Sequence, residues 1–168
     1  GSTSILIASE YLSNVHNGIG KMLGGITGIN PTEIVIIGAG IAGEYAAKTA
    51  IGLGALVKIF DKSFLKLERL QNNIKHPIFT SVLQPKILNN ALKTADVVIG
   101  AINPSISNRK FFVSEDMVKN MKRGSVIIDI SIDQGGCFET SKLTDLKNPV
   151  YIKHGVVHYC VPNISSRV

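Results

Sequence analysis

Residues 33–43 decide the fold of this 168-residue chain, and they read Glu33-Ile34-Val35-Ile36-Ile37-Gly38-Ala39-Gly40-Ile41-Ala42-Gly43. The part before the first glycine is a continuous, mostly β-branched run, which is typical of strands buried on both faces of a sheet. It passes directly into the pattern Gly-x-Gly-x-x-Gly, and small residues of helical character follow as far as Leu53. Strand, glycine turn and helix in this order predict the first unit of an α/β fold with a doubly wound parallel sheet.

Each glycine of the pattern has a mechanical role in binding a dinucleotide. Gly38 permits the tight turn, Gly40 lets a pyrophosphate approach the backbone, and Gly43 lets the helix pack closely on the strand. The N-terminus of the helix offers free N–H groups and a positive dipole end to the phosphates. The alternative stays open that the glycines serve the turn alone, because glycine turns are common in a chain with 16 glycines.

A second predicted strand, residues 56–61, ends in the carboxylate of Asp61. An acidic side chain at this place can accept hydrogen bonds from both hydroxyls of an adenosine ribose, and it repels a 2′-phosphate. The sequence therefore favours NAD over NADP as the cofactor, although Lys62 directly afterwards could soften that preference. Two alternatives stay open: Asp61 caps the next helix, or the ligand is another nucleotide, as in methyltransferases.

Strand-like and helix-like segments alternate along the remaining chain. Strands are expected over residues 78–80, 97–101, 125–130 and 155–161, and helices over residues 63–73, 85–93 and 114–121. In the first of these helices Leu65, Leu67 and Leu70 are expected to face inward. The alternation implies right-handed crossovers and a parallel sheet with helices on both faces, a Rossmann-type domain over residues 31–164. Ahead of it, residues 5–23 predict about three turns of helix with Leu6 and Leu12 in an apolar stripe.

Composition and charge exclude several classes of protein. Hydrophobic residues make up 45% and charged residues 18%, which rules out a disordered chain. No apolar run reaches the roughly 18 residues of a membrane span and no secretion signal is recognised, so a cytoplasmic protein without a membrane partner is expected. The net charge of +6 is dispersed, so nucleic acid is not an expected partner.

The two cysteines and the histidines give no metal-binding pattern. Cys137 and Cys160 lack CxxC spacing, and no histidine cluster has ligand spacing, so no metal site is expected. Cys137 follows two glycines, but no histidine is placed by sequence to activate it, and we expect it to pack in the core. His158 alternates within a strand and is expected to be a structural histidine.

Residues 128–141, Ile-Asp-Ile-Ser-Ile-Asp-Gln-Gly-Gly-Cys-Phe-Glu-Thr-Ser, closely resemble the signature of the alanine dehydrogenases. Their relatives, the α subunit of proton-translocating transhydrogenase and the lysine-pathway dehydrogenases, share the fold but diverge in this run. Shorter matches lie at residues 24–28, 95–101, 121–126 and 158–163. The resemblance implies a domain of an enzyme that oxidises L-alanine with NAD and water to pyruvate, ammonia and NADH.

The resemblance also implies a role for each residue that matches the family's motifs. Asp133 would be the catalytic aspartate, and it follows a predicted strand at the rim where doubly wound sheets collect ligands. The alternative, a loop aspartate that satisfies backbone amides, stays open from sequence alone. The residues expected to hold the cofactor are Gly38, Gly40, Ile41, Ala42, Gly43, Asp61, Lys66, Ile102, Asn103, Ile130, Ser131, Ile132, Asp133, Val161, Asn163 and Ile164.

The chain departs from the family after the strand at 97–101, where residues 102–109 replace a loop rich in Val, Pro, Gly and Ala. The family's substrate-binding arginine, lysine and histidine belong to a separate domain. We therefore expect residues 1–30 to be a truncated interdomain helix with a glycine-rich connector, residues 31–164 to be the NAD domain, and the substrate domain to be absent. The truncated helix is expected to lack its packing partner and to expose apolar surface.

The resemblance further implies that the parent enzyme is a homo-oligomer, a hexamer in many relatives, with NAD(H) and alanine or pyruvate as partners. The fragment alone is expected to bind NAD without turnover, because hydride transfer needs the amine carbon held against the nicotinamide. The alternatives are a nucleotide-binding regulatory module and a domain like that of the transhydrogenase α subunit.

Overall fold

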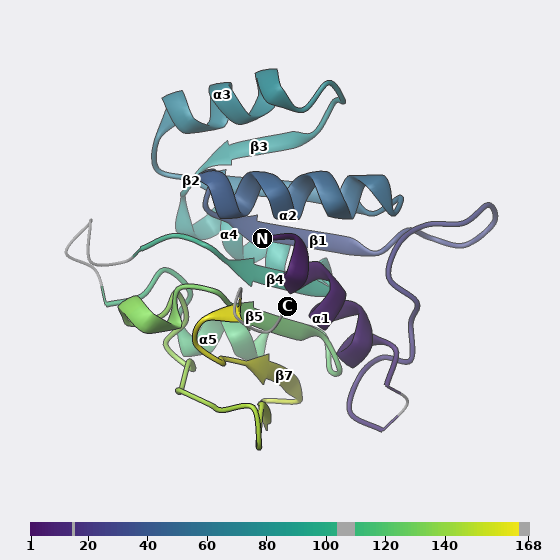
Figure 1. The fold of residues 1–168 in the computed structure, drawn as a ribbon, viewed down its shortest axis with the longest axis vertical. Coiled ribbons are helices and arrows are strands. Elements are labelled where there is room, and N and C mark those ends of the chain that lie inside the picture. Colours follow the sequence, from purple (N-terminus) through teal and green to yellow (C-terminus); the bar gives the residue numbers. More distant parts are fainter. Residues whose placement is uncertain (15, 104–109, 165–168) are drawn as a thin grey trace.

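The computed structural model describes residues 1–14, 16–103 and 110–164, and within them seven strands form one sheet. The strand order is β3-β2-β1-β4-β5-β7-β6, so the direction of winding reverses between β1 and β4 (Figure 1). All neighbouring strands pair in parallel except β6 and β7, which are antiparallel. The strands are β1 (Glu33–Ile37), β2 (Leu56–Asp61), β3 (Phe79–Val82), β4 (Val97–Gly100), β5 (Val126–Asp129), β6 (Val150–Lys153) and β7 (Val156–Tyr159).

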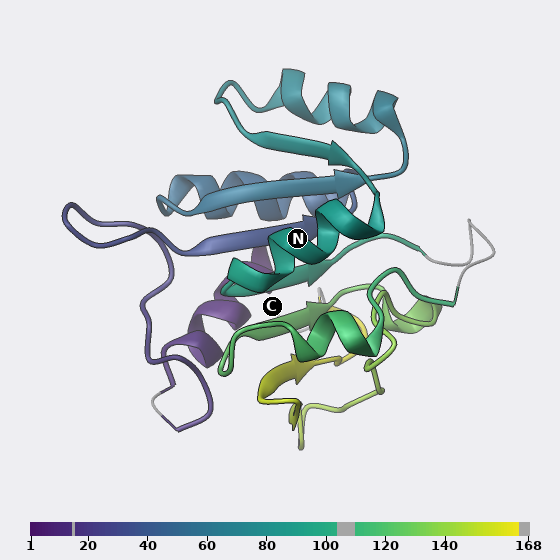
Figure 2. The same ribbon diagram turned by 180° about the vertical axis from the view of Figure 1, so that it is seen from behind.

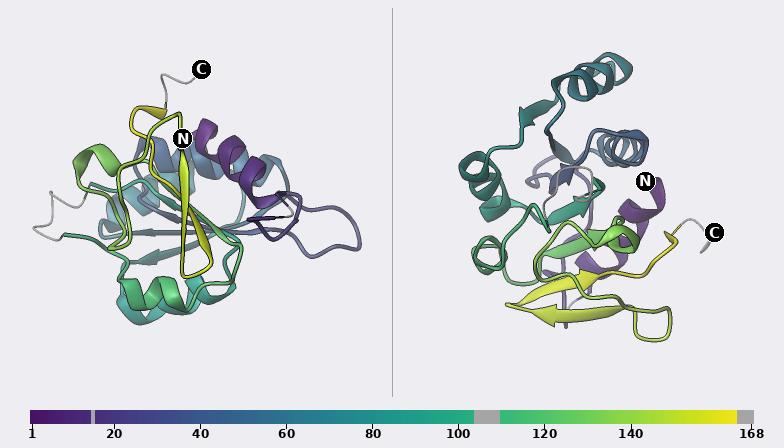
Figure 3. Two further views of the ribbon diagram at one scale, coloured as in Figure 1. Left: turned by 90° about the horizontal axis from the view of Figure 1, so that it is seen from below. Right: turned by 90° about the vertical axis from the view of Figure 1, so that its left-hand side faces the viewer.

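Helices cover both faces of this sheet, as the alternation of segments predicts. One face carries α1 (Ser2–Leu12), α2 (Ile41–Gly52) and α3 (Phe64–Asn73). The other carries α4 (Pro85–Thr94) and α5 (Glu115–Lys119), as Figure 2 and the right-hand view of Figure 3 show. The predicted fold class, a doubly wound α/β domain, is confirmed.

The apolar run of β1 explains why the sheet lies in the middle of the domain. Ile34 and Ile36 pack into the core beneath α1, α2 and α3, whereas Val35 and Ile37 pack beneath α4 and α5. Successive side chains of a strand point to opposite faces, so a continuous apolar run needs cover on both sides. Each of these side chains is at most 1% exposed, and burying one contributes about 1.5–3 kcal/mol.

The first helix has the predicted length of about three turns, but it differs from its prediction in position and packing. It spans Ser2–Leu12, so it begins before residue 5, and Leu6 of the predicted stripe is 62% exposed. Ile5, Ala8 and Leu12 are fully buried, because the helix lies against α2 and against β4 and β5. Contrary to the expectation that nothing local covers its apolar stripe, the helix packs on this chain's own sheet, and exposed apolar surface remains at Leu6.

The structure corrects one further prediction and adds one strand that was not predicted. Leu65 is 73% exposed, because α3 buries only the stripe through Leu67 and Leu70, and a residue two positions before Leu67 lies on another side of the helix. Strand β6 was not expected. Its residues are half-buried or exposed at the edge of the sheet, so they lack the strong apolar pattern of the central strands.

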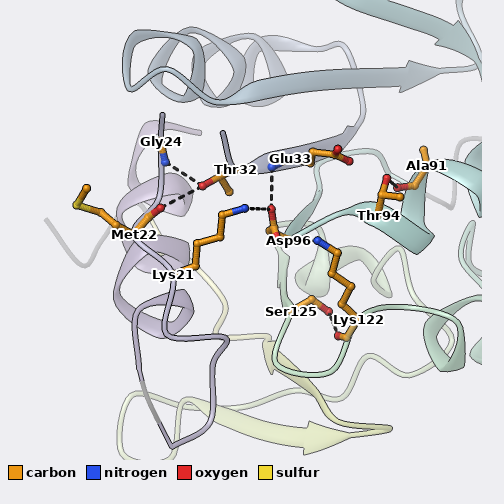
Figure 4. A network of polar contacts seen from close by, with 10 residues as sticks. All are labelled: Lys21, Met22, Gly24, Thr32, Glu33, Ala91, Thr94, Asp96, Lys122 and Ser125. Atoms are coloured by element: carbon orange, nitrogen blue, oxygen red, sulfur yellow. Dashed lines mark hydrogen bonds and ion pairs between the residues drawn. The ribbon is translucent and has the colours of Figure 1, made fainter. Parts of the chain in front are cut away.

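A buried ion network ties the connector after α1 to the sheet (Figure 4). Asp96, which precedes β4, is 1% exposed and accepts hydrogen bonds from Lys21 Nζ (3.1 Å), Lys122 Nζ (3.0 Å) and the Glu33 N–H (2.9 Å). Burial opposes ionisation of this carboxyl, but the bonds from Glu33, Lys122 and Lys21 outweigh it and lower its pKa. Asp96 thus joins three segments at the edge of the sheet where β1 and β4 begin.

Replacing Asp96 by Asn should destabilise the chain by about 2 kcal/mol, because the part-buried Glu33 N–H and two lysines lose a charged acceptor. Urea unfolding at pH 7 measures this change. The control is Asp116→Asn, whose carboxylate is 92% exposed and whose loss should change the free energy of unfolding by less than about 0.5 kcal/mol. Equal effects of the two substitutions would contradict the role assigned to Asp96.

Candidate functional site

β1 and β4 are paired to their carboxyl ends, and the helices that follow them lie on opposite faces of the sheet, so a cleft opens between the two connections. Ligands of doubly wound sheets bind at this switch point. The cleft has a volume of about 320 Å³ and is lined by Gly40, Ala42, Asp61, Lys66, Ala101, Ile102, Asn103, Ile130, Ser131, Asp133 and Gln134. A second cavity of about 300 Å³ shares Ala42, Ile130 and Asp133 with it and adds Gly1, Thr3, Asn163 and Ile164.

The glycine turn has the backbone shape that its sequence predicts. Gly38 adopts φ 121°, and a Cβ atom there would lie 2.5 Å from the carbonyl oxygen of Ala101. A Cβ atom on Gly43 would lie 1.9 Å from the carbonyl oxygen of Gly38, so the start of α2 packs directly on the turn. A Cβ atom on Gly40 would meet nothing within 4 Å. The surface at Gly40 is therefore open to a ligand.

Helix α2 begins at this open surface. Its N-cap is Gly40, which provides no side-chain hydrogen bond to the first turn. The N–H groups of a helix's first turn lack partners within the helix and carry the positive end of its dipole. With Gly40 and Ala42 both lining the cleft, this helix end is suited to an anion.

Asp61 closes one end of the cleft and is only 3% exposed. Its Oδ2 accepts a hydrogen bond from the Ala39 N–H (2.8 Å) in the glycine turn, and its Oδ1 accepts one from the Ser63 N–H (2.8 Å). Ser63, and not Asp61, is the N-cap of α3, since its hydroxyl accepts from the Lys66 N–H. The carboxylate thus connects the turns that follow β1 and β2.

The two lysines near Asp61 are placed differently. Lys66 lines the cleft together with Asp61. Lys62 has its Nζ 5.6 Å from the centre of the Phe112 ring, a cation–π distance. Of the two, Lys66 is therefore the lysine that shares the cavity with the carboxylate.

Asp133 lies at the boundary of both cavities. It belongs to a single 3₁₀ turn, η2 (Ile132–Gln134), which follows β5 after two residues. Gly135 and Gly136, with φ 104° and 82°, then reverse the chain. The sequence IDQGG therefore places the Asp133 side chain beyond the C-terminal end of β5, and its two glycines reverse the direction of the chain directly afterwards.

Most of the residues expected at the cofactor site line one of the two cavities, but five do not. Gly38 and Gly43 shape the turn, as described above, and Val161 is buried. Ile41 is exposed beside the cavities, and Ile132 contributes to neither lining. In the loop that departs from the family, Ile102 and Asn103 line the cleft, and residues 104–109 lie outside the described part of the chain.

Four residues that line the cavities were not predicted from the sequence: Ala101, Gln134, Gly1 and Thr3. Ala101 directly follows β4 and Gln134 follows Asp133, so their positions at strand ends could have indicated them. Thr3 lies in α1, and only the packing of that helix on α2 brings it to the site.

Cys137 and His158 have the structural roles that the sequence predicts. Burial and the charge of Asp129 raise the pKa of the Cys137 thiol to about 12, and its Sγ donates to the Ile102 carbonyl. His158 is fully buried, donates from Nδ1 to the Val156 carbonyl (2.8 Å) and accepts the Thr140 hydroxyl proton at Nε2 (2.8 Å). Burial lowers the pKa of His158 to about 4.

Part of the chain's pH-dependent stability should come from His158. The folded chain keeps this ring neutral down to about pH 4, whereas the unfolded chain protonates it near pH 6.5. The unfolded state therefore binds more protons between these values, and stability falls by roughly 3 kcal/mol as the pH drops through that window. Urea unfolding at pH 7.5 and pH 4.5 should show this loss, and His158→Gln should remove it. The control is the exposed His76→Gln, which should leave the loss unchanged; an unchanged loss in His158→Gln would refute the assignment.

Within the described residues, no group of three or more His, Cys, Asp or Glu side chains could hold a metal ion. The same part of the chain contains no helix that is long and apolar enough to cross a membrane.

The fold and the cleft together define a class of protein. An open doubly wound sheet with a glycine turn at its switch point, an uncapped helix end and a carboxylate after the second strand form a Rossmann-type dinucleotide-binding domain.

Comparisons with known proteins carry the assignment further. Residues 4–168 match the family model described as alanine dehydrogenase/PNT, C-terminal domain. The chain is 44% identical over 169 residues to an alanine dehydrogenase of Staphylococcus haemolyticus, with 100% of this chain and 45% of that protein covered. It therefore belongs to the alanine dehydrogenase/PNT C-terminal domain family, which gives it a nicotinamide dinucleotide as cofactor.

Solved structures agree with this assignment. An L-alanine dehydrogenase structure has a TM-score of 0.91 at 37% identity and covers 98% of this chain and 46% of its own. A transhydrogenase from Sinorhizobium meliloti, with a TM-score of 0.76 at 21% identity over 99% of this chain and 46% of its own, shares the fold alone. The chain spans about half the length of the relatives it matches.

Proposed function

We propose that this chain is the NAD-binding domain of an L-alanine dehydrogenase, which oxidises L-alanine with NAD and water to pyruvate, ammonia and NADH. The observation that carries the proposal is a single cleft at the switch point that unites the glycine turn, Asp61 and Asp133. The alanine dehydrogenases that match the chain over its whole length support the choice of substrate.

The described residues fit a dinucleotide along the cleft. The pyrophosphate would be held by the turn at Gly40 and by the uncapped N-terminus of α2. A Cβ atom on Gly40 would have no neighbour within 4 Å, so there is room for a ligand at this point. The adenosine ribose would be held by Asp61, whose charge disfavours a 2′-phosphate and so favours NAD over NADP. The nicotinamide end would lie toward Ile130, Asp133 and Asn163.

Chemistry at the nicotinamide end would involve the residues around Asp133. A bound nicotinamide supplies the hydride acceptor. The carboxylate of Asp133, at the boundary of the two cavities, would orient the substrate amine or a water molecule. Ile130 and Ile164 would line this end with apolar surface and limit the access of water.

The remaining half of the relatives' length would supply the groups that bind the substrate carboxylate. On this proposal the chain alone binds the cofactor and turns over no alanine, because the reacting carbon is not held in place. The complete enzyme would be a cytoplasmic homo-oligomer, as the family resemblance implies.

Calorimetric titration of the chain with NADH and NADPH tests the cofactor assignment. NADH should bind at least about tenfold more tightly than NADPH. Asp61→Asn should weaken NADH binding about tenfold, because it removes a charged acceptor, and it should reduce the difference between the NADH and NADPH affinities. The exposed Asp145→Asn is the matched control and should change neither affinity. No binding of either cofactor would overturn the proposed function, and tighter binding of NADPH would overturn the role of Asp61.

Steady-state kinetics of the complete enzyme test the role of Asp133. Asp133→Asn should lower kcat for alanine oxidation by about 100-fold or more, because the carboxylate acts at the reacting carbon. The affinity for NADH should stay within about twofold, since the amide has nearly the shape of the carboxylate it replaces and Asp133 is assigned to the reacting carbon of the substrate and not to holding the cofactor. Unchanged turnover would remove Asp133 from the mechanism.

A further inference from the structure

A buried carboxylate that lies outside both cavities holds the loop that carries Asp133. Asp129 ends β5 and is fully buried. Its Oδ1 accepts a hydrogen bond from the Ser131 N–H (3.0 Å), and its Oδ2 accepts from the Cys137 N–H (2.9 Å) and from the Ser141 hydroxyl. One side chain therefore bonds to the beginning, the middle and the end of the segment between β5 and residue 141.

The backbone of this segment leaves room for the carboxylate of Asp129 because Gly136 has no side chain. Gly136 has φ 82°, and a Cβ atom on it would lie 2.8 Å from Asp129 Oδ2 and 3.0 Å from Cβ of Ser141. A larger residue would therefore push the loop away from the carboxylate. Apart from the three residues of η2, the segment from Ile130 to Gly136 contains no helix or strand. Backbone hydrogen bonds from Gln134 and Gly136 to the Ser131 carbonyl close its turn, and Asp129 binds the N–H of Ser131 at the start of the turn and that of Cys137 directly after it. The bonds to Asp129 therefore fix where the turn is attached to the end of β5.

The segment forms one end of the cleft and not the other. Ile130, Ser131, Asp133 and Gln134 line the larger cavity, and Ile130 and Asp133 also line the smaller one. The opposite end of the cleft is built from Gly40 and other residues on β2, α2 and α3. A change in the course of the segment would therefore alter the nicotinamide end and leave the adenosine end in place.

We propose that Asp129 is a positioning residue that preforms the nicotinamide end of the cleft by holding the Asp133 loop, without touching cofactor or substrate. The inference rests on the proposed function and extends it. Two carboxylates at the ends of two strands shape the two ends of one site: Asp61 holds the glycine turn through Ala39, and Asp129 holds the Asp133 loop.

Asp129→Asn tests this directly, because an amide has one acceptor oxygen where the carboxylate has two. If the amide oxygen accepts from Ser131, the amide NH₂ group faces the Cys137 N–H, and two donors meet. The hydroxyl of Ser141 can rotate and accept from the new NH₂ group, but the backbone N–H of Cys137 has no such freedom. In the opposite orientation the amide oxygen accepts from Cys137 and the NH₂ group faces the Ser131 N–H, which cannot rotate either. In both orientations one backbone N–H of the loop loses its acceptor, and the loop must shift there.

The measurement compares two ligands, NADH and ADP-ribose, which differ by the nicotinamide. Calorimetric titrations of the wild-type chain and of Asp129→Asn give both affinities. The variant should lose about tenfold in affinity for NADH and stay within about twofold for ADP-ribose. The ratio of the two affinities is informative because a general loosening of the domain would weaken both ligands together.

Two further variants keep the test decisive if Asp129→Asn folds poorly. Ser141→Ala removes one of the hydrogen bonds to Asp129 and should shift the ratio of the two affinities in the same direction by a smaller factor. Gly136→Ala should shift it strongly, because the added Cβ atom presses on the carboxylate. The matched control is Asp96→Asn, which alters an equally buried carboxylate at the opposite edge of the sheet and should lower stability without changing the ratio.

The outcomes separate the inference from the function on which it rests. A wild-type chain that binds neither ligand overturns the proposed function and the inference with it. A wild-type chain that binds both, together with loop variants that keep the wild-type ratio or lose both ligands equally, overturns the role of Asp129 alone.

Discussion

The site depends on one close approach of backbone to backbone, at the point where β1 ends. Gly38 donates its N–H to the Phe60 carbonyl on β2 (2.7 Å), and a Cβ atom on it would collide with the Ala101 carbonyl beyond β4. The turn therefore fits between the two neighbouring strands only because it has no side chain. Gly43 likewise has no side chain, which lets α2 begin directly on the turn. The first turn of the helix therefore lies at the cleft beyond the ends of β1 and β4.

Around this turn, three buried or nearly buried aspartates organise the two edges of the sheet. Asp61 and Asp129 end their strands at the carboxyl edge, and each accepts hydrogen bonds from two backbone N–H groups of the loops that form the cleft. Asp96 precedes β4 at the opposite edge and binds two lysines. A buried carboxylate needs several hydrogen-bond donors to offset its lost hydration. For Asp61 and Asp129 these donors are backbone N–H groups of the loops that form the cleft, so the same bonds hold the loops in place. The hydrogen bonds of these aspartates therefore contribute both to the stability of the fold and to the shape of the site.

The sequence predicted the central βα units well, because their signals are local. The apolar run of β1, the glycine turn and the strand that ends in Asp61 each depend on neighbouring residues, and the structure contains all three. The sequence failed where packing decides the outcome. The packing partner of α1 is formed by elements distant in sequence, and the edge strand β6 is too weakly apolar to be recognised without its partner β7.

The candidate site divides in the same way. The sequence by itself determined which chemical groups are available, since the glycine pattern, Asp61 and the IDQGG run each specify a local turn with a functional atom. Only the tertiary structure decided that these groups share one cleft, that Thr3 joins them from α1, and that Asp129 holds the loop of Asp133 from beneath. The physical reason is that parallel strands bring residues distant in sequence to one edge, where burial and hydrogen-bond geometry select which of them meet.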